Sequence, residues 1–230
     1  MKWTHRKKII YKSVIFVVIC LLVCSCSHKS GHNRDKNKDG KEINKTNTLT
    51  EVEPILTANE IFEMCNTAVF MIVGSNTQAS GFFVTSDGLA ISNYHVINNL
   101  YSKNDIIVLS NGDRYSIKEI VKYSEYYDYA IFTTTCRNTN YLSISDKQFK
   151  VGDKVYAIGS PYGLQNTFSS GEISQIRNKY IIQTTAQVDY GASGGALINE
   201  HGEVIGITSA ITDNSTANLN FAISLEVIDR

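Results

Sequence analysis

From about residue 56 the chain is a succession of short apolar segments separated by turn residues. One segment, 59–65, predicts a short helix, and the others have the period or the length of β-strands. The predicted strands are 68–74, 81–85, 89–92, 106–109, 115–121, 129–134, 154–158, 171–176, 180–184, 196–198, 204–210 and 220–223. About a dozen short strands with almost no helical pattern predict an all-β barrel or sandwich.

The first 25 residues follow a different pattern. An apolar run of eleven residues, 14–24, comes after a basic stretch. A membrane-spanning helix needs about 20 such residues, so this run predicts a cleaved export signal over 1–25. It resembles a bacterial lipoprotein signal, since Ser25 precedes Cys26 as a small residue precedes the lipidated cysteine. We expect lipidation at Cys26 rather than Cys24; a signal without lipidation is the alternative.

Residues 26–55 contain almost no large apolar side chain and predict a flexible polar tether, with one domain over 56–230. His28 and His32 are read as solvated histidines of this tether, and no metal site is expected. In the domain, Cys65 and Cys136 remain either as two buried thiols or as one disulfide.

The formal net charge of zero is an average over unlike parts. Residues 1–26 carry five basic and no acidic side chains, and residues 27–53 carry six basic and five acidic ones. Residues 54–230 carry 11 basic and 17 acidic side chains, a net charge of −6. An acidic domain repels phosphate backbones, so nucleic acid is not an expected partner.

The most specific motif surrounds Ser193 in the segment Asp189-Tyr190-Gly191-Ala192-Ser193-Gly194-Gly195. A serine between glycines at a turn lets the backbone approach a substrate, with amide groups free for a developing oxyanion. The residues after it predict a strand, whereas the elbow of α/β-hydrolases leads into a helix. A glycine-rich hairpin with an incidental serine is the alternative.

A serine nucleophile needs a base, and a base needs an orienting carboxylate. His95 is the candidate base, because the other histidines lie in the signal, in the tether or, for His201, in a polar turn. Asp128 is the candidate carboxylate, because it stands among aromatic residues at the head of an apolar strand, where a lone charge is costly. A buried structural histidine is the alternative for His95.

The order His95, Asp128, Ser193 is that of chymotrypsin-like proteases. Five stretches resemble the HtrA (Deg) family of trypsin-like serine proteases. They are Ser80 to Val96, Tyr127-Asp128-Tyr129-Ala130, Gly152 to Leu164, the nucleophile segment, and the last strands from Gly202 to Ile223. The resemblance covers about 60–228.

The resemblance implies two six-stranded antiparallel β-barrels with the active site in the cleft between them. It implies that His95 is the base, Asp128 the orienting group and Ser193 the nucleophile. It also implies an oxyanion hole of backbone N–H groups in the segment 191–193, at Gly191 and Ser193 with Ala192 between them. Family members commonly have Asn where this chain has Ala192, which puts the local loop geometry in question.

Family members also carry a C-terminal PDZ domain, and none is expected here after Arg230. A homotrimer is expected from the resemblance alone. The specificity pocket is expected at Gln187 and at the strand of Thr208, Ser209 and Ala210, which should pair with extended substrate. Because Gln187 is neutral and Thr208 is not a histidine, an uncharged, small or aliphatic residue is the expected preference.

We therefore expect a serine endopeptidase of the bacterial cell envelope that is exported, lipid-anchored and active on unfolded or extended proteins. No cofactor and no metal are expected. A protease-fold module that binds peptides without cutting them, and an esterase that uses the same three residues, are the alternatives.

Overall fold

The computed structural model describes residues 54–75, 78–100, 106–160, 166–210 and 219–228, all within the compact unit of residues 51–230. The expected export signal, Cys26 and most of the tether, with His28 and His32, lie outside the described residues. In the part of the chain that is described, no helix is long and apolar enough to cross a membrane.

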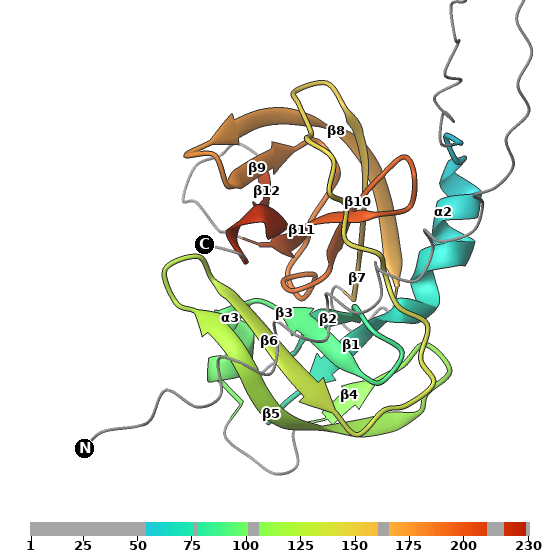
Figure 1. Ribbon diagram of the computed structural model, residues 1–230, viewed down its shortest axis with the longest axis vertical. Helices are drawn as coiled ribbons and strands as arrows, with labels where there is room; N and C mark the ends of the chain where they lie inside the picture. Colours follow the sequence, from blue (N-terminus) through green and yellow to red (C-terminus); the bar gives the residue numbers. More distant parts are fainter. Residues whose placement is uncertain (1–53, 76–77, 101–105, 161–165, 211–218, 229–230) are drawn as a thin grey trace, which may run out of the picture. The chain divides into compact units, whose positions relative to one another are not determined.

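The first six strands close into one barrel, here barrel 1, drawn from cyan to yellow-green in Figure 1. They are β1 (Val69–Val73), β2 (Gln78–Phe83), β3 (Leu89–Ser92), β4 (Ile106–Val108), β5 (Arg114–Ser124) and β6 (Tyr129–Thr134). The order around the barrel is β1-β2-β3-β6-β5-β4, and all neighbouring pairs are antiparallel.

The other six strands close into barrel 2, drawn from yellow to red in Figure 1. They are β7 (Lys154–Gly159), β8 (Thr167–Arg177), β9 (Ile181–Thr184), β10 (Ala196–Asn199), β11 (Val204–Ser209) and β12 (Asn220–Ser224). The order is β10-β11-β12-β9-β8-β7, again antiparallel throughout. The predicted fold class, two six-stranded antiparallel barrels, is confirmed.

Three apolar clusters hold this arrangement together. One fills barrel 1 around Phe70 and Phe132, and another fills barrel 2 around Ile182 and Leu197. The third contains side chains from both barrels and from the first helix, with Phe82, Ile158 and Ile61 among them. Because burial of apolar surface stabilises by roughly 25 cal/mol per Å², the shared cluster ties the barrels to each other.

In the described ranges, two short α-helices and two 3-10 turns accompany the strands: α2 (Ala58–Cys65), η1 (Asn66–Ala68), α3 (Tyr94–Asn98) and η3 (Leu225–Val227). Helix α2 was predicted over residues 59–65. Its start is fixed by a capping box, in which Thr57 accepts from the backbone of Glu60 and the Glu60 carboxylate accepts from the backbone of Thr57.

The predicted strands all form, with differences at their ends. Strands β5 and β8 are each 11 residues long and begin before the predicted segments. Helix α3 was not predicted, because the segment from Ile91 to Ile97 has the apolar content of a strand. The strand β3 ends at Ser92 as predicted, and Asn93 takes an extended conformation that begins a helical turn.

Cys65 and Cys136 are both buried and both free, so of the two alternatives the structure has two thiols and not a disulfide. Cys65 lies in the shared apolar cluster with its Sγ 3.7 Å from the carbonyl oxygen of Gly202. Burial raises the pKa of the Cys65 thiol to about 11, so this residue is an unreactive part of the core at neutral pH.

Candidate active site

His95 and Asp128 lie within hydrogen-bonding distance of each other in barrel 1. His95 Nδ1 is 2.8 Å from Asp128 Oδ2 and 3.1 Å from Oδ1. The backbone N–H of His95 also donates to Asp128 Oδ1, at 2.9 Å. With its proton on Nδ1, the imidazole donates to the carboxylate and keeps Nε2 as an acceptor.

Two local structures make this pair. Asn93 begins helix α3, which places His95 in the first turn. The side-chain amide of Asn93 donates to the backbone oxygen of Asp128 at 3.0 Å. Asp128 closes a turn by donating its N–H to Glu125 O at 3.3 Å, and its φ is 53°. Asp tolerates this left-handed conformation better than most residues, so the turn presents the carboxylate just before β6 begins.

Ser193 lies in a tight turn of barrel 2, between β9 and β10. The turn is held by hydrogen bonds from Ala192 N to Asp189 O at 2.9 Å and from Gly195 N to Ala192 O at 3.0 Å. Ser193 is 8% exposed, and its Oγ accepts a hydrogen bond from the N–H of Ala210 at 3.0 Å. The hydroxyl proton of Ser193 therefore remains available to a base.

The backbone N–H groups of Gly191 and Ser193 donate to no acceptor among the described residues. Gly191 has a φ of 95°, which glycine adopts without strain. The N–H of Ala192, also expected in the oxyanion hole, is occupied by Asp189 O within the turn. The N–H groups of Gly191 and Ser193 are therefore available to bind an oxyanion, whereas that of Ala192 is not.

Ser80 of barrel 1 holds the nucleophile turn of barrel 2. Its N–H donates to Ser193 O at 2.8 Å, and its Oγ donates to Gly191 O at 2.9 Å. The same Oγ accepts from the N–H of Ser160 at 2.8 Å. Gly194, with φ of 87°, packs so closely that an added Cβ would lie 2.1 Å from Ser80 O. These contacts of Ser80 were not predicted, because Ser80 lies next to the predicted strand 81–85 and its partners are distant in the sequence.

His95 and Ser193 line one cavity of about 240 Å³, together with Gly191, Ala210 and Gln78. The structure therefore brings the three predicted catalytic residues to the same cleft from two barrels. No hydrogen bond joins His95 to Ser193 in the described geometry, where Ser193 Oγ is bonded to Ala210 instead. Catalytic hydrogen bonds in proteins without substrate are often incomplete, so this arrangement is compatible with a base and a nucleophile.

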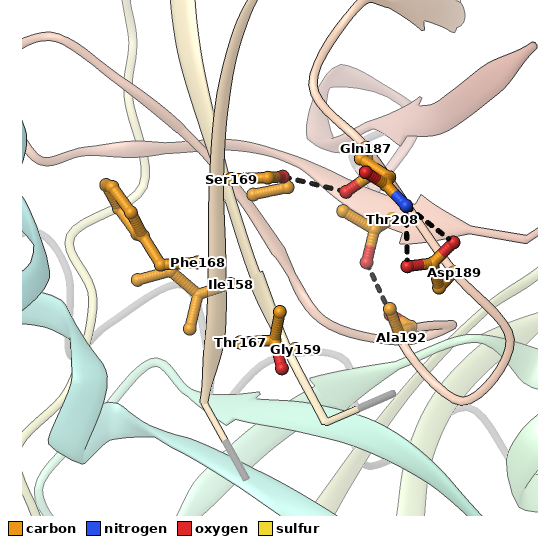
Figure 2. Close-up of a pocket in the computed structure, with 10 residues that line it drawn as sticks. Ile158, Gly159, Thr167, Phe168, Ser169, Gln187, Asp189, Ala192 and Thr208 are labelled. Atoms are coloured by element: carbon orange, nitrogen blue, oxygen red, sulfur yellow. Dashed lines mark hydrogen bonds between the residues drawn. The ribbon is translucent and has the colours of Figure 1, made fainter. Parts of the chain in front are cut away.

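A second cavity, of about 110 Å³, contains Gln187 and Thr208, two of the predicted substrate-binding residues (Figure 2). The Gln187 amide donates to both carboxylate oxygens of Asp189, at 2.9 and 3.1 Å. Thr208 Oγ1 donates to Ala192 O at 2.6 Å. Asp189, which the sequence placed only in the turn, thus also lines this cavity.

The other two predicted substrate-binding residues differ in their surroundings. Ala210 lines the cavity of His95 and Ser193, whereas Ser209 is buried on β11. The backbone of Thr208 is already used, because its N–H donates to Gly195 O and its carbonyl accepts from Gly194 N. Pairing of this strand with a substrate backbone stays a prediction, and among the three residues Ala210 is the one that lines the catalytic cavity.

Within the described ranges, no group of three or more His, Cys, Asp or Glu side chains could hold a metal ion. The cleft instead offers one imidazole–carboxylate pair, one serine hydroxyl and two unengaged amide donors. This set can activate a hydroxyl nucleophile and stabilise an oxyanion, which is the chemistry of acyl transfer.

Comparison with known proteins agrees with this chemistry, because the matches are to serine peptidases. Residues 79–207, more than half of the chain, match the model of the family described as "Trypsin-like peptidase domain". The chain is 38% identical over 158 residues to a "Probable periplasmic serine endoprotease DegP-like" of Halomonas elongata, an alignment that covers 64% of this chain and 33% of that protein. It is 35% identical over 167 residues to "Serine endoprotease DegS" of Haemophilus influenzae, covering 66% of this chain and 48% of that protein.

Among solved structures, the crystal structure of the serine endoprotease from Yersinia pestis superposes with a TM-score of 0.68 at 28% identity. That match covers 75% of this chain and 64% of the other. The chain spans about a third to a half of the length of the curated relatives that it matches.

Proposed function

The chain belongs to the trypsin-like serine peptidases of the HtrA type, and on this premise we propose that it is an endopeptidase acting through His95, Asp128 and Ser193. Its substrates are unfolded or extended protein segments, which it cleaves through an acyl-enzyme. The observation that carries the proposal is the His95–Asp128 pair, which faces the same cavity as the Ser193 hydroxyl.

In the first half of the reaction, Ser193 Oγ attacks the carbonyl carbon of the peptide bond while His95 Nε2 takes the hydroxyl proton. Asp128 stabilises the imidazolium through the hydrogen bond to Nδ1–H. The N–H groups of Gly191 and Ser193 bind the oxyanion. The C–N bond then breaks, His95 gives its proton to the leaving amine, and the acyl group stays on Ser193.

In the second half, a water molecule attacks the acyl carbon and transfers a proton to His95. The Oγ–C bond breaks, the proton returns to Ser193, and the carboxylic acid product leaves. For the first step, the Ser193 hydroxyl must turn from Ala210 N toward His95 Nε2. This movement is a side-chain rotation and is compatible with the volume of the cavity.

The pocket at Gln187 and Thr208 supports a small, uncharged side chain before the cleaved bond. Its volume is about 110 Å³, and Ile158 and Ala192 contribute apolar walls. The carboxylate of Asp189 is engaged by the Gln187 amide, so it is not free for a basic side chain without losing that contact. Substrate backbone pairs at Ala210, which lines the catalytic cavity.

We place the protein in the bacterial cell envelope. Residues 1–25 act as the export signal, Cys26 carries the lipid, 26–55 form the tether, and 56–230 form the protease domain. The basic and apolar pattern of the signal supports this, as does the periplasmic location in the names of relatives. Assembly into a homotrimer belongs to the same proposal. Mass spectrometry of the membrane fraction tests lipidation of Cys26 against Cys24, and sedimentation tests the trimer.

Labelling with a fluorophosphonate probe tests the catalytic assignment, because only an activated serine hydroxyl reacts. Wild-type protein should be labelled at Ser193, and Ser193→Ala should lose the label and at least about 10³-fold of its proteolytic rate while remaining folded. A protein that binds extended peptides but takes no label is the silent binding module. A labelled protein that hydrolyses esters and leaves peptides intact is the esterase.

A further inference from the structure

A larger groove leads from the catalytic cavity along barrel 1. Its volume is about 500 Å³, and its walls include Met71 and Val73 of β1 and Val108 of β4. Gln78 and Tyr190 line both this groove and the cavity of His95 and Ser193. The groove is therefore a continuation of the active-site cleft, and a polypeptide bound in the cleft can extend into it.

Among the described residues that line this groove, one is a cation, Arg114 at the start of β5. Arg114 lies opposite Val108 on β4, and Val108 lies opposite Met71 on β1, so the three residues cross neighbouring strands. Arg114 is exposed, and its guanidinium makes neither a hydrogen bond nor an ion pair within the described part of the chain. Its planar fork of N–H donors matches a carboxylate.

The chemistry of the cleft fixes which half of a substrate occupies the groove. The leaving amine takes its proton from His95, so the segment after the cleaved bond departs on the side of His95. His95 and the walls of the groove other than Tyr190 belong to barrel 1, whereas Ala210 and Ser193 belong to barrel 2. The groove therefore receives the residues on the C-terminal side of the cleaved bond.

We propose that Arg114 binds a carboxylate on the C-terminal side of the cleaved bond, and that the protein consequently favours substrates with apolar residues followed by an acidic group there. This inference rests on the proposed function of the same cleft. The carboxylate comes from an Asp or Glu side chain or from the end of the substrate chain; both present the same group to the guanidinium.

The test uses the full-length protein and quenched fluorescent peptides that share one cleavable sequence. In one series, Asp moves through successive positions after the cleaved bond in peptides with an amidated end, each paired with its Asn analogue. In a second series, the free C-terminal carboxylate stands at the same positions. At one position, kcat/KM for the acidic peptide should exceed that of its neutral partner about fivefold at low salt. The preference should shrink as ionic strength rises.

Arg114→Gln should bring this ratio to about one, and Arg114→Glu should reverse it in favour of a Lys peptide. Lys118→Gln is the matched control, because Lys118 is an exposed cation on the same strand that does not line the groove, and it should keep the wild-type ratio. A ratio that stays unchanged in Arg114→Gln, or that falls equally in Lys118→Gln, overturns the proposal. The series that shows the preference identifies the source of the carboxylate.

Binding measurements separate this inference from the proposed activity. Fluorescence anisotropy with Ser193→Ala and the same peptides reports the groove without any cleavage. Tighter binding of the acidic peptide that disappears with the added Arg114→Gln substitution supports the groove even if the wild-type protein cleaves nothing. Cleavage by the wild-type protein with equal rates and affinities for acidic and neutral peptides would reject the role of Arg114 and leave the catalytic proposal intact.

Discussion

The two barrels contribute to the cleft in different ways. Barrel 1 supplies a complete unit, since His95 and Asp128 are already joined by side-chain and backbone hydrogen bonds within that barrel. Barrel 2 supplies Ser193 on a turn in which the carbonyl groups of Gly191 and Ser193 accept hydrogen bonds from Ser80 of barrel 1. Base and carboxylate thus depend on one barrel, whereas the nucleophile depends on the contact between the two.

Because of this difference, substitutions that remove proton transfer can be distinguished from substitutions that displace the nucleophile. A change in the His95–Asp128 pair should remove proton transfer and leave the nucleophile turn in place. A change at the contact between the barrels should alter the turn and leave the pair in place. Four substitutions test this division.

Asp128→Asn should have the largest effect, a fall in kcat of about 10⁴-fold with little change in fold. The amide favours the wrong tautomer of His95, so Nε2 no longer accepts the proton of Ser193. The rate and the pH profile of peptide cleavage measure this effect, with circular dichroism to check the fold. Asp153→Asn is the control, because that carboxylate accepts from Lys150 N in a turn outside the catalytic cavity. Equal losses in both variants would contradict the role of Asp128.

Gly194→Ala should disrupt the contact between the barrels. The added Cβ would lie 2.1 Å from Ser80 O and 2.2 Å from Ser92 Oγ, at a φ of 87°. We expect a loss of at least about 3 kcal/mol in the free energy of unfolding, measured with urea, together with loss of probe labelling at Ser193. Gly152→Ala has a similar φ and open space around the new Cβ, so it should cost only about 1 kcal/mol. Similar losses for both would mean that backbone strain, and not the contact with Ser80, decides the effect.

The sequence predicted an all-β barrel or sandwich from strand periodicity and turn residues, and its resemblance to the HtrA family implied the two barrels. It predicted His95, Asp128 and Ser193 as candidate catalytic residues from their local settings and from the same resemblance. It did not predict Ser80, whose role depends on a contact between residues 111 or more positions apart along the chain. It also did not predict helix α3, which carries His95, since apolar content alone does not distinguish a strand from a helix in a short segment. The local sequence pattern thus did not predict long-range hydrogen bonds or the short helix α3.

Ser80→Ala tests the same contact without adding volume. The substitution leaves Gly191 O and Ser160 N without their hydrogen-bond partner, both in buried surroundings. We expect a loss of about 2 kcal/mol in the free energy of unfolding and a roughly tenfold fall in kcat, because Gly191 carries one of the two proposed oxyanion donors. Ser224→Ala removes a buried serine that lines neither the catalytic cavity nor the cavity at Gln187, and it should lower stability without lowering kcat beyond the folded fraction. If kcat per folded molecule is unchanged in Ser80→Ala, the turn does not depend on barrel 1.

Asp189→Asn should have the smallest effect and concerns barrel 2 alone. The substitution removes the charge from the cavity at Gln187 and keeps the shape and the contact between the two side chains. If the carboxylate only holds the Gln187 amide, kcat/KM for peptides with a small apolar residue before the cleaved bond should change by less than about threefold. Peptides with Lys or Arg at that position should remain poor substrates for both proteins. A wild-type preference for Lys or Arg that disappears in Asp189→Asn would instead make Asp189 the specificity residue. Barrel 2 would then supply a charged recognition group of its own, opposite in sign to Arg114 in barrel 1, and the cleft would select a basic residue before the bond and an acidic one after it.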